Sequence, residues 1–592
     1  MTSTSARPQG LLPRTDIDAW WRDAVIYQIY PRSFADANGD GIGDIQGIRE
    51  HIDHLVALGV DAVWLSPFYP SPQVDAGYDV SDYFDLAPEY GSLQDLDALI
   101  ADLHEAGIRV IIDLVPNHSS DQHAWFRAAL EAGPGSPERD RYIFRHSADG
   151  APNNWGSLFG GPAWQPVEPL TGRSQDRGWY YLHLFAAEQP DFNWSNADVH
   201  EHFRTFLRFW VERGVEGFRV DVAHGLVKAE GLPDDDLGPD RWNIAASPDE
   251  DTAHEKLPDV GPAFNQPGVH DIYREWRRVL DEVGEDILLV AEAWVPTEAD
   301  AAQYVRADEM SQAFNFPFLG AGWDADELRR VIDVSLSEYG AVGAPATWVL
   351  SNHDVVRHAS RLAYPADMDT DPGIGPKDPQ PDAELGLARA RAATLFMLGL
   401  PGSAYLYQGE ELGLPEHTTM EDEARQDPLW ERTNHLVPGR DGCRVPLPWT
   451  RDGASYGYNA TGRTWLPQPE GWGEYSPQAQ EGCEDSTLTL YRRSIALRRE
   501  LGLGRGSVEW LDSEPGVLHL RNGTTGIVLN TTEQPVAIEG AGKPLITSWH
   551  RSEVDGADSA DTVDAADAVV VPPNGACWLD DSAGGTDGGD PR

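Results

Sequence analysis

Positive charge is scarce in this chain. Its 592 residues contain 45 Lys and Arg against 97 Asp and Glu, a formal net charge of −52 at pH 7. Binding to nucleic acid or to an anionic membrane depends on an excess of Lys and Arg. We therefore predict neither as a partner. A solvated surface, of the kind found in some high-salt or actinobacterial proteomes, also accounts for the acidity, and the sequence does not separate these causes.

Cysteine is rare, and long apolar runs are missing. Cys443, Cys483 and Cys577 are too few for a disulfide framework in so long a chain, and no metal-type spacing joins them. Reduced thiols in the cytoplasm are the simplest interpretation. Residues 1–14 contain no apolar segment of a secretory signal. No run of about eighteen apolar residues occurs, so we predict no membrane span.

The ordered part of the chain repeats one pattern: a short apolar run, an amphipathic run that ends at glycine, and the next apolar run. Residues 48–58 stop at Gly59 in this way, and residues 93–106 stop at Gly107. Such repeats are typical of parallel βα units. Eight candidate strands follow, at residues 24–31, 60–67, 108–115, 217–222, 287–293, 313–316, 347–352 and 403–408. We predict an α/β fold with a (β/α)8 TIM barrel.

The interval between the third and fourth strands is far longer than the roughly 30 residues of one barrel unit. Its surplus is rich in Gly, Pro, Trp and Asn, which indicates an inserted subdomain. After residue 503 short alternating runs replace helical periodicity, as in an antiparallel β domain. We predict five segments: a flexible N-terminus (1–16), the barrel (17–116 and 186–503), the inserted B domain (117–185), a C-terminal β-sandwich (504–580) and a flexible tail (581–592).

Four of the strands end in ionisable residues. Arg219 and Asp221 are two residues apart on one strand and so point to the same side. An arginine and an aspartate spaced in this way usually form a structural ion pair when they occur in isolation. However, Asn117 and His118, Glu292, and Asn352 to Asp354 also follow buried runs. Barrels of this type place their chemistry at the carboxyl ends of the strands, so these residues together indicate one active site.

Several motifs resemble glycoside hydrolase family 13, the α-amylase superfamily, and within it the α-glucosidase and oligo-1,6-glucosidase branch, with an actinobacterial-like character. The matching stretches are residues 59–67 (GVDAVWLSP), 113–118 (DLVPNH), 189–194 (QPDFNW), 217–224 (GFRVDVAH), 291–294 (AEAW), 351–354 (SNHD) and 407–414 (YQGEELGL). They occur in the family's order over about 400 residues, essentially the whole predicted barrel.

The resemblance implies a retaining double displacement. Two carboxyl groups about 5–5.5 Å apart act as nucleophile and as acid/base in such enzymes. The pattern implies Asp221 as the nucleophile and Glu292 as the acid/base, whose surroundings must hold it protonated near neutral pH. It implies that Arg219 orients the nucleophile and that Asp354 holds the 2- and 3-hydroxyls. His118 and His353 would donate to sugar hydroxyls, although core imidazoles are the structural alternative.

The resemblance also implies an exo-acting pocket that removes one glucose at a time. Asp79 and Arg357 correspond to a salt bridge that binds the 4- and 6-hydroxyls of the terminal glucose and closes the pocket. Tyr78 would provide an aromatic platform for the sugar. Arg444 resembles an arginine near the +1 side, with a surface arginine as the alternative.

A structural metal site is expected early in the chain. Residues 36–44 place oxygen ligands at alternate positions with glycine at the tight turn. The segment differs from an EF-hand because Gly47 stands where a bidentate Glu is required. The resemblance supports structural Ca²⁺, or Mg²⁺, held by Asp36, Asn38, Asp40, the Ile42 carbonyl and Asp44. A metal-free Asp/Asn/Gly turn is the alternative.

The expected activity is release of α-glucose from maltose and short α-glucosides. Val222, after the nucleophile, is common in α-1,6-acting members, but the residues that follow it resemble actinobacterial maltose-type enzymes, so we favour α-1,4 over α-1,6. The alternatives are an oligo-1,6-glucosidase, or a transglucosylase or a sucrose or maltose isomerase on the same barrel. A non-catalytic transporter heavy chain is disfavoured because those relatives have a membrane anchor and lack the catalytic residues. The partner is an oligosaccharide; monomer and homo-oligomer both stay open.

Overall fold

The computed structural model describes residues 19–238, 260–284, 286–365, 368, 370, 372–549 and 568–581. The predicted flexible N-terminus (1–16) lies outside these residues, as does the predicted tail apart from residue 581. In the described part of the chain, no helix is both long and apolar enough to cross a membrane.

Eight parallel strands form the central barrel, as predicted. They are β1 (Val25–Ile29), β2 (Ala62–Leu65), β3 (Arg109–Leu114), β7 (Gly217–Val220), β8 (Leu288–Ala291), β9 (Gln312–Ala313), β10 (Thr347–Val349) and β11 (Ser403–Tyr407). Their order in the sheet is β10-β11-β1-β2-β3-β7-β8-β9. Strands consecutive in the barrel are neighbours in the sheet, apart from β9 and β10, which stand at the two ends of this order, and β11 returns to pair with β1 in parallel. This arrangement brings the carboxyl ends of distant segments to one face of the barrel.

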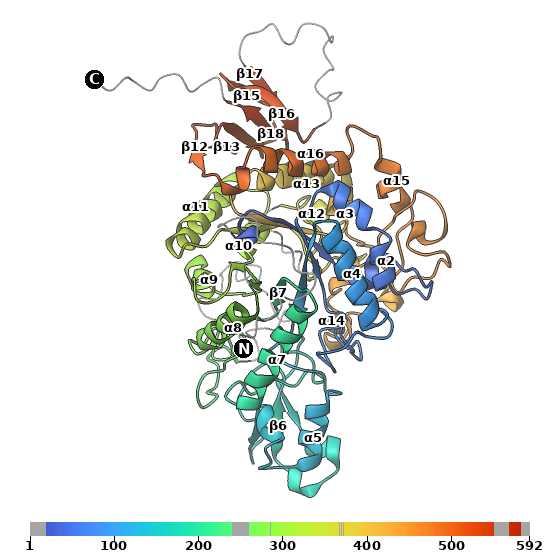
Figure 1. The fold of residues 1–592 in the computed structure, drawn as a ribbon, viewed down its shortest axis with the longest axis vertical. Helices are drawn as coiled ribbons and strands as arrows, with labels where there is room; N and C mark the ends of the chain where they lie inside the picture. The colour runs from blue at the N-terminus through green and yellow to red at the C-terminus, as the bar shows by residue number, and fades with distance from the viewer. Residues whose placement is uncertain are drawn as a thin grey trace, which may run out of the picture.

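Helices surround these strands (Figure 1). The main ones are α3 (Ile52–Leu58), α4 (Leu93–Glu105), α7 (Ala197–Glu212), α8 (Val269–Val283), α9 (Glu298–Tyr304), α11 (Ala325–Ala341), α13 (Ala383–Leu398) and α16 (Thr487–Glu500). The glycine stop predicted at Gly59 is confirmed: its φ of 86° is left-handed, and its N–H closes the last turn of α3. At the start of α4, Ser92 and Asp95 form a capping box.

The sixth strand is shorter than predicted and ends earlier. We predicted residues 313–316, whereas β9 is Gln312–Ala313 and helix α10 (Phe316–Gly320) begins at once. The Asn315 side chain caps this helix by accepting a hydrogen bond from the Phe318 N–H at 3.0 Å. Pro317 occupies the first turn of the helix, where its missing N–H costs nothing. The apolar run therefore contains the end of a strand and the start of a helix.

Side chains fill the barrel interior. Ile26, Trp64, Ile111 and Tyr405 belong to one buried cluster. Full burial of a large apolar side chain contributes roughly 1.5–3 kcal/mol. This packed layer supports the polar residues at the strand ends; the Trp64 indole, for example, donates to Asp113 Oδ2 at 3.0 Å.

Two β units flank the barrel, in the places expected from the sequence. Between β3 and β7 lies a three-stranded antiparallel sheet of β4 (Phe144–His146), β6 (Trp179–Leu182) and β5 (Trp164–Pro166), beside helix α5 (Ala124–Ala132). After α16 come β12 (Glu509–Trp510), β13 (Val517–Asn522), β14 (Thr525–Asn530), β15 (Val536–Glu539), β16 (Lys543–Thr547), β17 (Ala568–Val571) and β18 (Ala576–Asp580). They form antiparallel sheets of five and two strands. Figure 1 shows the two units at opposite ends of the molecule.

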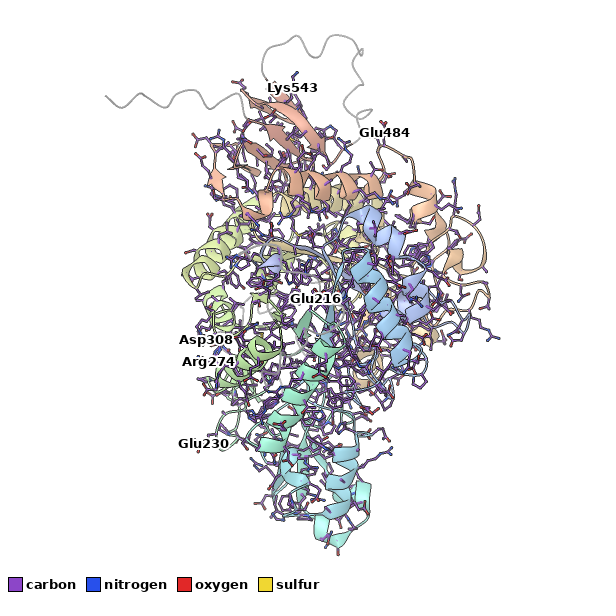
Figure 2. All side chains as sticks on the ribbon, viewed as in Figure 1. Glu216, Glu230, Arg274, Asp308, Glu484 and Lys543 are labelled. Carbon is purple, nitrogen blue, oxygen red and sulfur yellow. The ribbon has the colours of Figure 1, made fainter. Side chains whose placement is uncertain are left out.

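The C-terminal sheet packs on helices α13 and α16. Trp578 is buried there, and its indole donates to the Leu395 carbonyl at 3.0 Å. Figure 2 shows Glu230, Asp308 and Glu484 projecting at the outer edge of the molecule, and all three are exposed.

Candidate active site

One buried arginine joins three carboxylates at or near the carboxyl ends of three strands. Arg219 Nη1 lies 2.8 Å from Asp113 Oδ1 and 2.6 Å from Asp221 Oδ1, and its Nη2 lies 3.1 Å from Glu292 Oε2. The guanidinium is planar and rigid, so it fixes all three groups relative to one another. The strand ends therefore converge, as the sequence indicated. The sequence did not indicate that Arg219 would also bind Glu292.

Glu292 receives two further hydrogen bonds. The Val222 N–H donates to Oε2 at 2.8 Å, and the Trp294 indole donates to Oε1 at 3.0 Å. Val222 has a φ of 44°, a left-handed value that β-branched residues rarely adopt. This strained turn follows directly after Asp221 and directs its N–H to Glu292. Strain of this kind is characteristic of functional sites.

Burial and like charge dominate the electrostatics of this cluster. Burial raises the pKa of Asp221; Arg219 opposes the shift, and the nearby Glu292 and Asp113 add to it. Burial likewise raises the pKa of Asp113 to about 6, against the effect of Arg219. For both Asp113 and Asp221, burial together with the neighbouring negative charge therefore outweighs the attraction of Arg219.

Asp354 is the acceptor in a second cluster. Its Oδ1 lies 3.0 Å from Arg440 Nη1 and 2.9 Å from Arg444 Nη2, and its Oδ2 lies 3.2 Å from His353 Nε2. Burial opposes ionisation, but the charges of Arg440 and Arg444 outweigh it and hold the pKa of Asp354 well below its usual range. Asp354 is therefore an ionised, preoriented acceptor for donors such as sugar hydroxyls.

Tyr78 and His353 form one layer beside Asp354. Their rings stack at 2° with centroids 5.3 Å apart, and the Tyr78 hydroxyl lies 2.6 Å from His353 Nε2. Burial lowers the pKa of His353, so its imidazole is neutral at pH 7. His353 Nδ1 lies 2.7 Å from Gln28 Nε2, which links this layer to strand β1.

The predicted ion pair between Asp79 and Arg357 is wrong. Asp79 accepts hydrogen bonds from Ser71 Oγ at 2.7 Å and from two backbone N–H groups of its own loop, those of Val74 and Asp75. Arg357 donates to two backbone carbonyls, those of Gln408 and Cys443, both at 2.8 Å. Within the described residues, neither side chain forms an ion pair. Both residues hold loops in place.

The ion pair at this end of the site joins Asp75 and Arg440 instead. Asp75 Oδ1 lies 2.9 Å from Arg440 Nη2, and both side chains are largely buried. We did not single out either residue from the sequence. Asp75 lies three positions before Tyr78, and Arg440 lies four positions before Arg444. Their closeness in sequence to two predicted site residues was the signal that could have identified them. The choice between Asp75 and Asp79 depends on the turn that bends at Ala76 and Gly77, with φ values of 48° and 107°.

His118 contacts the same loop. Its Nε2 lies 3.2 Å from the Tyr78 carbonyl oxygen and 3.1 Å from Gln189 Nε2. Burial lowers its pKa to about 4, so it is neutral at pH 7. The neighbouring Asn117 accepts a hydrogen bond from Lys228 Nζ at 2.7 Å, and Lys228 also lies 2.8 Å from Asp191 Oδ2. This buried ammonium joins the loops after β3 and β7, and the sequence analysis missed it.

In the predicted metal loop, the two outer carboxylates bind backbone N–H groups. Asp36 accepts hydrogen bonds from the backbone N–H groups of Gly39 and Gly41, and Asp44 from those of Asn38 and Gly47. Burial raises the pKa of Asp44, and nearby Asp36 adds to the shift. Two carboxylates this close together fit a hard divalent ion by their chemistry. No group of three or more His, Cys, Asp or Glu arranged for a metal is found among the described residues, and the metal remains a prediction.

Known proteins resemble this chain over most of its length. Residues 28–504 match the family model "Alpha amylase, catalytic domain". A probable alpha-glucosidase of Rhizobium meliloti is 38% identical over 84% of this chain and 86% of its own length. An oligo-1,6-glucosidase of Parageobacillus thermoglucosidasius is 34% identical over 81% and 84%. The crystal structure of an alpha-glucosyl transfer enzyme superposes with a TM-score of 0.79 at 31% identity, covering 95% of this chain and 99% of that one.

Proposed function

Because the chain belongs to the alpha-amylase family, we propose that it is an exo-acting, retaining α-glucosidase. The observation that supports this best is the pair of carboxyl groups held by one arginine, Asp221 and Glu292 on Arg219. Retaining glycosidases need two carboxyl groups about 5–5.5 Å apart. Asp221 and Glu292 lie 2.6 and 3.1 Å from Nη1 and Nη2 of the same guanidinium, which supports their action as such a pair.

In the proposed reaction, Asp221 attacks the anomeric carbon while Glu292 gives its proton to the leaving oxygen. A glucosyl ester on Asp221 results, and Glu292, now a carboxylate, takes a proton from the incoming water. Asp354 binds ring hydroxyls, and its grip strengthens as the sugar flattens toward the oxocarbenium-like state. Arg219 contacts both Asp221 and Glu292, so it can stabilise whichever carboxylate is charged without moving. Such preorganisation avoids a cost of rearrangement during the reaction.

The exo preference follows from the network around Arg440. Its guanidinium binds Asp75, Asp354 and Asp427 with distances of 2.9, 3.0 and 2.6 Å. Such a network closes one end of the glucose pocket. We propose that Asp75 and Arg440 take the role that the sequence had given to Asp79 and Arg357. The preferred bond is α-1,4, with maltose and short maltooligosaccharides as substrates.

A transferase or isomerase is the second candidate. The alpha-glucosyl transfer enzyme and a trehalulose synthase both superpose with TM-scores of 0.79, at 31% and 30% identity. The same two carboxyl groups would serve that chemistry, with an acceptor hydroxyl in place of water. Transglucosylation at high sugar concentration is therefore part of the proposal.

Two further elements belong to the proposal. A structural Ca²⁺ or Mg²⁺ would be held by Asp36, Asn38, Asp40, the Ile42 carbonyl and Asp44; its chemistry is charge neutralisation within that loop. A cytoplasmic location fits the cysteines, all three of which are free, with Cys443 and Cys577 buried.

Time-resolved proton NMR tests the activity. Purified enzyme is mixed with maltose or with isomaltose, each at low and high concentration. Initial release of α-glucose from maltose is expected. A clear preference for isomaltose would overturn the α-1,4 assignment, and a rearranged disaccharide would move the protein to the isomerases. Asp221→Asn should abolish turnover with the fold intact, and full activity in that variant would contradict the proposal.

A further inference from the structure

Strand β1 contributes a buried amide to the edge of the site. Gln28, near the carboxyl end of β1, is only 1% exposed. Its Nε2 lies 3.0 Å from Ser66 Oγ, just after β2, and 2.7 Å from His353 Nδ1. The proposed reaction gives Gln28 no task. Burying an amide is costly unless it is hydrogen-bonded, so its two partners indicate what it does.

The ring of His353 has one proton to place on two nitrogens. Burial lowers the pKa of His353, and the neighbouring Asp354 only partly opposes this effect. Arg219, Arg440 and Arg444 lower the pKa further. The imidazole is therefore neutral at pH 7, with a proton on one nitrogen and a free acceptor on the other. The hydrogen-bond partners of the two nitrogens decide which of them carries the proton.

Both neighbours place that proton on Nε2. His353 Nε2 lies 3.2 Å from Asp354 Oδ2, an ionised acceptor. His353 Nδ1 faces the amide nitrogen of Gln28, which only donates. The opposite orientation of the amide would place its oxygen against Nδ1 and require the proton there. Nε2 would then present an acceptor to the Asp354 carboxylate, and two acceptors would face each other in a buried site.

The same tautomer gives the Tyr78 hydroxyl one direction. Its oxygen lies 2.6 Å from His353 Nε2 and 3.2 Å from Asp113 Oδ2. Burial raises the pKa of Tyr78, so the hydroxyl keeps its proton. With a proton on Nε2, the Tyr78 oxygen accepts from His353 and its O–H donates to Asp113. Asp113 binds Arg219 at 2.8 Å, so the chain of hydrogen bonds from β1 ends at the guanidinium that holds the proposed nucleophile.

We propose that Gln28 is a positioning residue that holds His353 as the neutral tautomer with its proton on Nε2. The inference rests on the proposed function and adds strand β1 to the glucose pocket. A proton on Nε2 lets His353 donate to a sugar hydroxyl while Asp354 accepts from one. In the other tautomer both groups would be acceptors and would compete for the same hydroxyl protons. Gln28 acts through His353 and is not itself catalytic.

The chain offers a matched control for Gln28. Gln312, in β9, is also fully buried, and its Nε2 donates to Ser403 Oγ at 2.9 Å and to the Trp21 carbonyl at 2.6 Å. Its Oε1 accepts from the Tyr405 hydroxyl at 2.8 Å. None of these partners belongs to the proposed site. Gln28→Met and Gln312→Met therefore each remove one buried amide from a barrel strand.

The two methionine variants separate positioning from packing. Gln28→Met should lower kcat for maltose by about tenfold, with a smaller change in KM, because Asp354 and its neighbours tighten on the sugar in the transition state. Gln312→Met should keep kcat within about twofold of wild type. Equal losses of kcat in the two variants would show that any buried amide of the barrel matters as much, and would overturn the proposal.

Gln28→Glu makes the test depend on pH. While the new carboxyl and Nδ1 share a proton, Nε2 keeps its own. Once that proton is lost, the carboxylate draws the remaining imidazole proton to Nδ1. The ratio of kcat/KM between variant and wild type should therefore fall by about tenfold or more between about pH 6 and pH 9. Gln312→Glu adds the same charge without an imidazole, and its ratio should stay constant. A constant ratio for Gln28→Glu would contradict the proposal.

Solid-state NMR of enzyme labelled with ¹⁵N and ¹³C histidine reads the tautomer without any substrate. The signals of His353 are those that disappear in His353→Asn. At pH 7 the wild type should show a proton on Nε2 and none on Nδ1, and Gln28→Glu at high pH should show the reverse. A wild-type proton on Nδ1, or an unchanged tautomer in Gln28→Glu, would overturn the role of Gln28. Absence of maltose hydrolysis in the wild type would instead defeat the proposed function, and the spectra would still decide what Gln28 does to His353.

Discussion

Asp75 and Arg440 form a buried ion pair, with Asp75 Oδ1 2.9 Å from Arg440 Nη2. Arg440 binds Asp354 and Asp427 at the same time. One guanidinium therefore couples the loop before Tyr78 to the residue proposed to hold the sugar's 2- and 3-hydroxyls. Removal of one buried charge leaves the remaining charges of the network incompletely balanced, which is costly in a buried site.

We expect Asp75 and Asp79 to differ sharply under the same substitution. Asp75→Asn removes the charge that Arg440 binds, and kcat/KM for maltose should fall by about 10²-fold, or about 3 kcal/mol. Asp79→Asn keeps an oxygen that accepts hydrogen bonds from the loop, so kcat/KM should stay within about fivefold of wild type. Steady-state kinetics on both variants checks this. A larger loss in Asp79→Asn than in Asp75→Asn would restore the role first assigned to Asp79.

Much of this molecule could be predicted from its sequence, and the failures have physical causes. Buried parallel strands are continuous apolar runs, so seven strands fell where expected, and those that end in Asp, Glu or His converge. The position of strand β9 was not predicted correctly, because Asn315 and Pro317 start a helix within the same apolar run. Side-chain partners across loops depend on turn conformation, as at Ala76 and Gly77. Lys228 was missed because a single lysine in a polar stretch gives no periodic signal.

Arg219→Lys should separate positioning from simple charge. Lysine keeps one positive charge but cannot bind Asp221 and Glu292 on two fixed nitrogens. We expect kcat for maltose to fall by about 10²–10³-fold while KM changes little, because the lost contacts act on the reacting groups. Circular dichroism controls for folding. A rise in KM with kcat unchanged would show that Arg219 serves substrate binding instead.

A buried carboxyl outside the site predicts a pH effect on stability. Burial raises the pKa of Glu410 to about 8, with Glu411 adding to the shift, while hydrogen bonds from the Tyr407 N–H and the Tyr491 hydroxyl oppose it. Its folded pKa exceeds its unfolded value, so its stabilising effect is complete below about pH 4.5 and is lost as pH rises through 8.

Glu410→Gln has no proton to lose over this range. Relative to wild type, its free energy of unfolding should therefore increase between pH 5 and pH 8.5, by about 2–4 kcal/mol. Urea unfolding at the two pH values measures the change. Glu431→Gln, at an exposed residue, is the control and should show none. An equal response of the two variants to pH would contradict the assignment.

Removal of divalent cations tests the loop of residues 36–44. If Ca²⁺ or Mg²⁺ neutralises Asp36 and Asp44, EDTA should lower the melting temperature, and either ion in excess should restore it in proportion to its affinity. Asp36→Asn should reduce the response to EDTA. The catalytic carboxylates are not part of this loop, so residual activity at low temperature should persist. A melting temperature indifferent to EDTA and to added ions would favour the metal-free turn.

Replacement of Lys228 should destabilise the protein, because Asp191 and Asn117 would lose a buried partner. Its ammonium is buried and lies 2.8 Å from Asp191 Oδ2 and 2.7 Å from Asn117 Oδ1. Lys228→Met fills similar volume but strands a buried carboxylate, at a cost of about 3–5 kcal/mol. Adding Asp191→Asn removes that charge, so the double variant should be more stable than Lys228→Met alone. Chemical unfolding of the three variants forms a double-mutant cycle. If the two single changes add without coupling, Lys228 and Asp191 do not depend on each other, and the ammonium is not what holds the loops after β3 and β7 together.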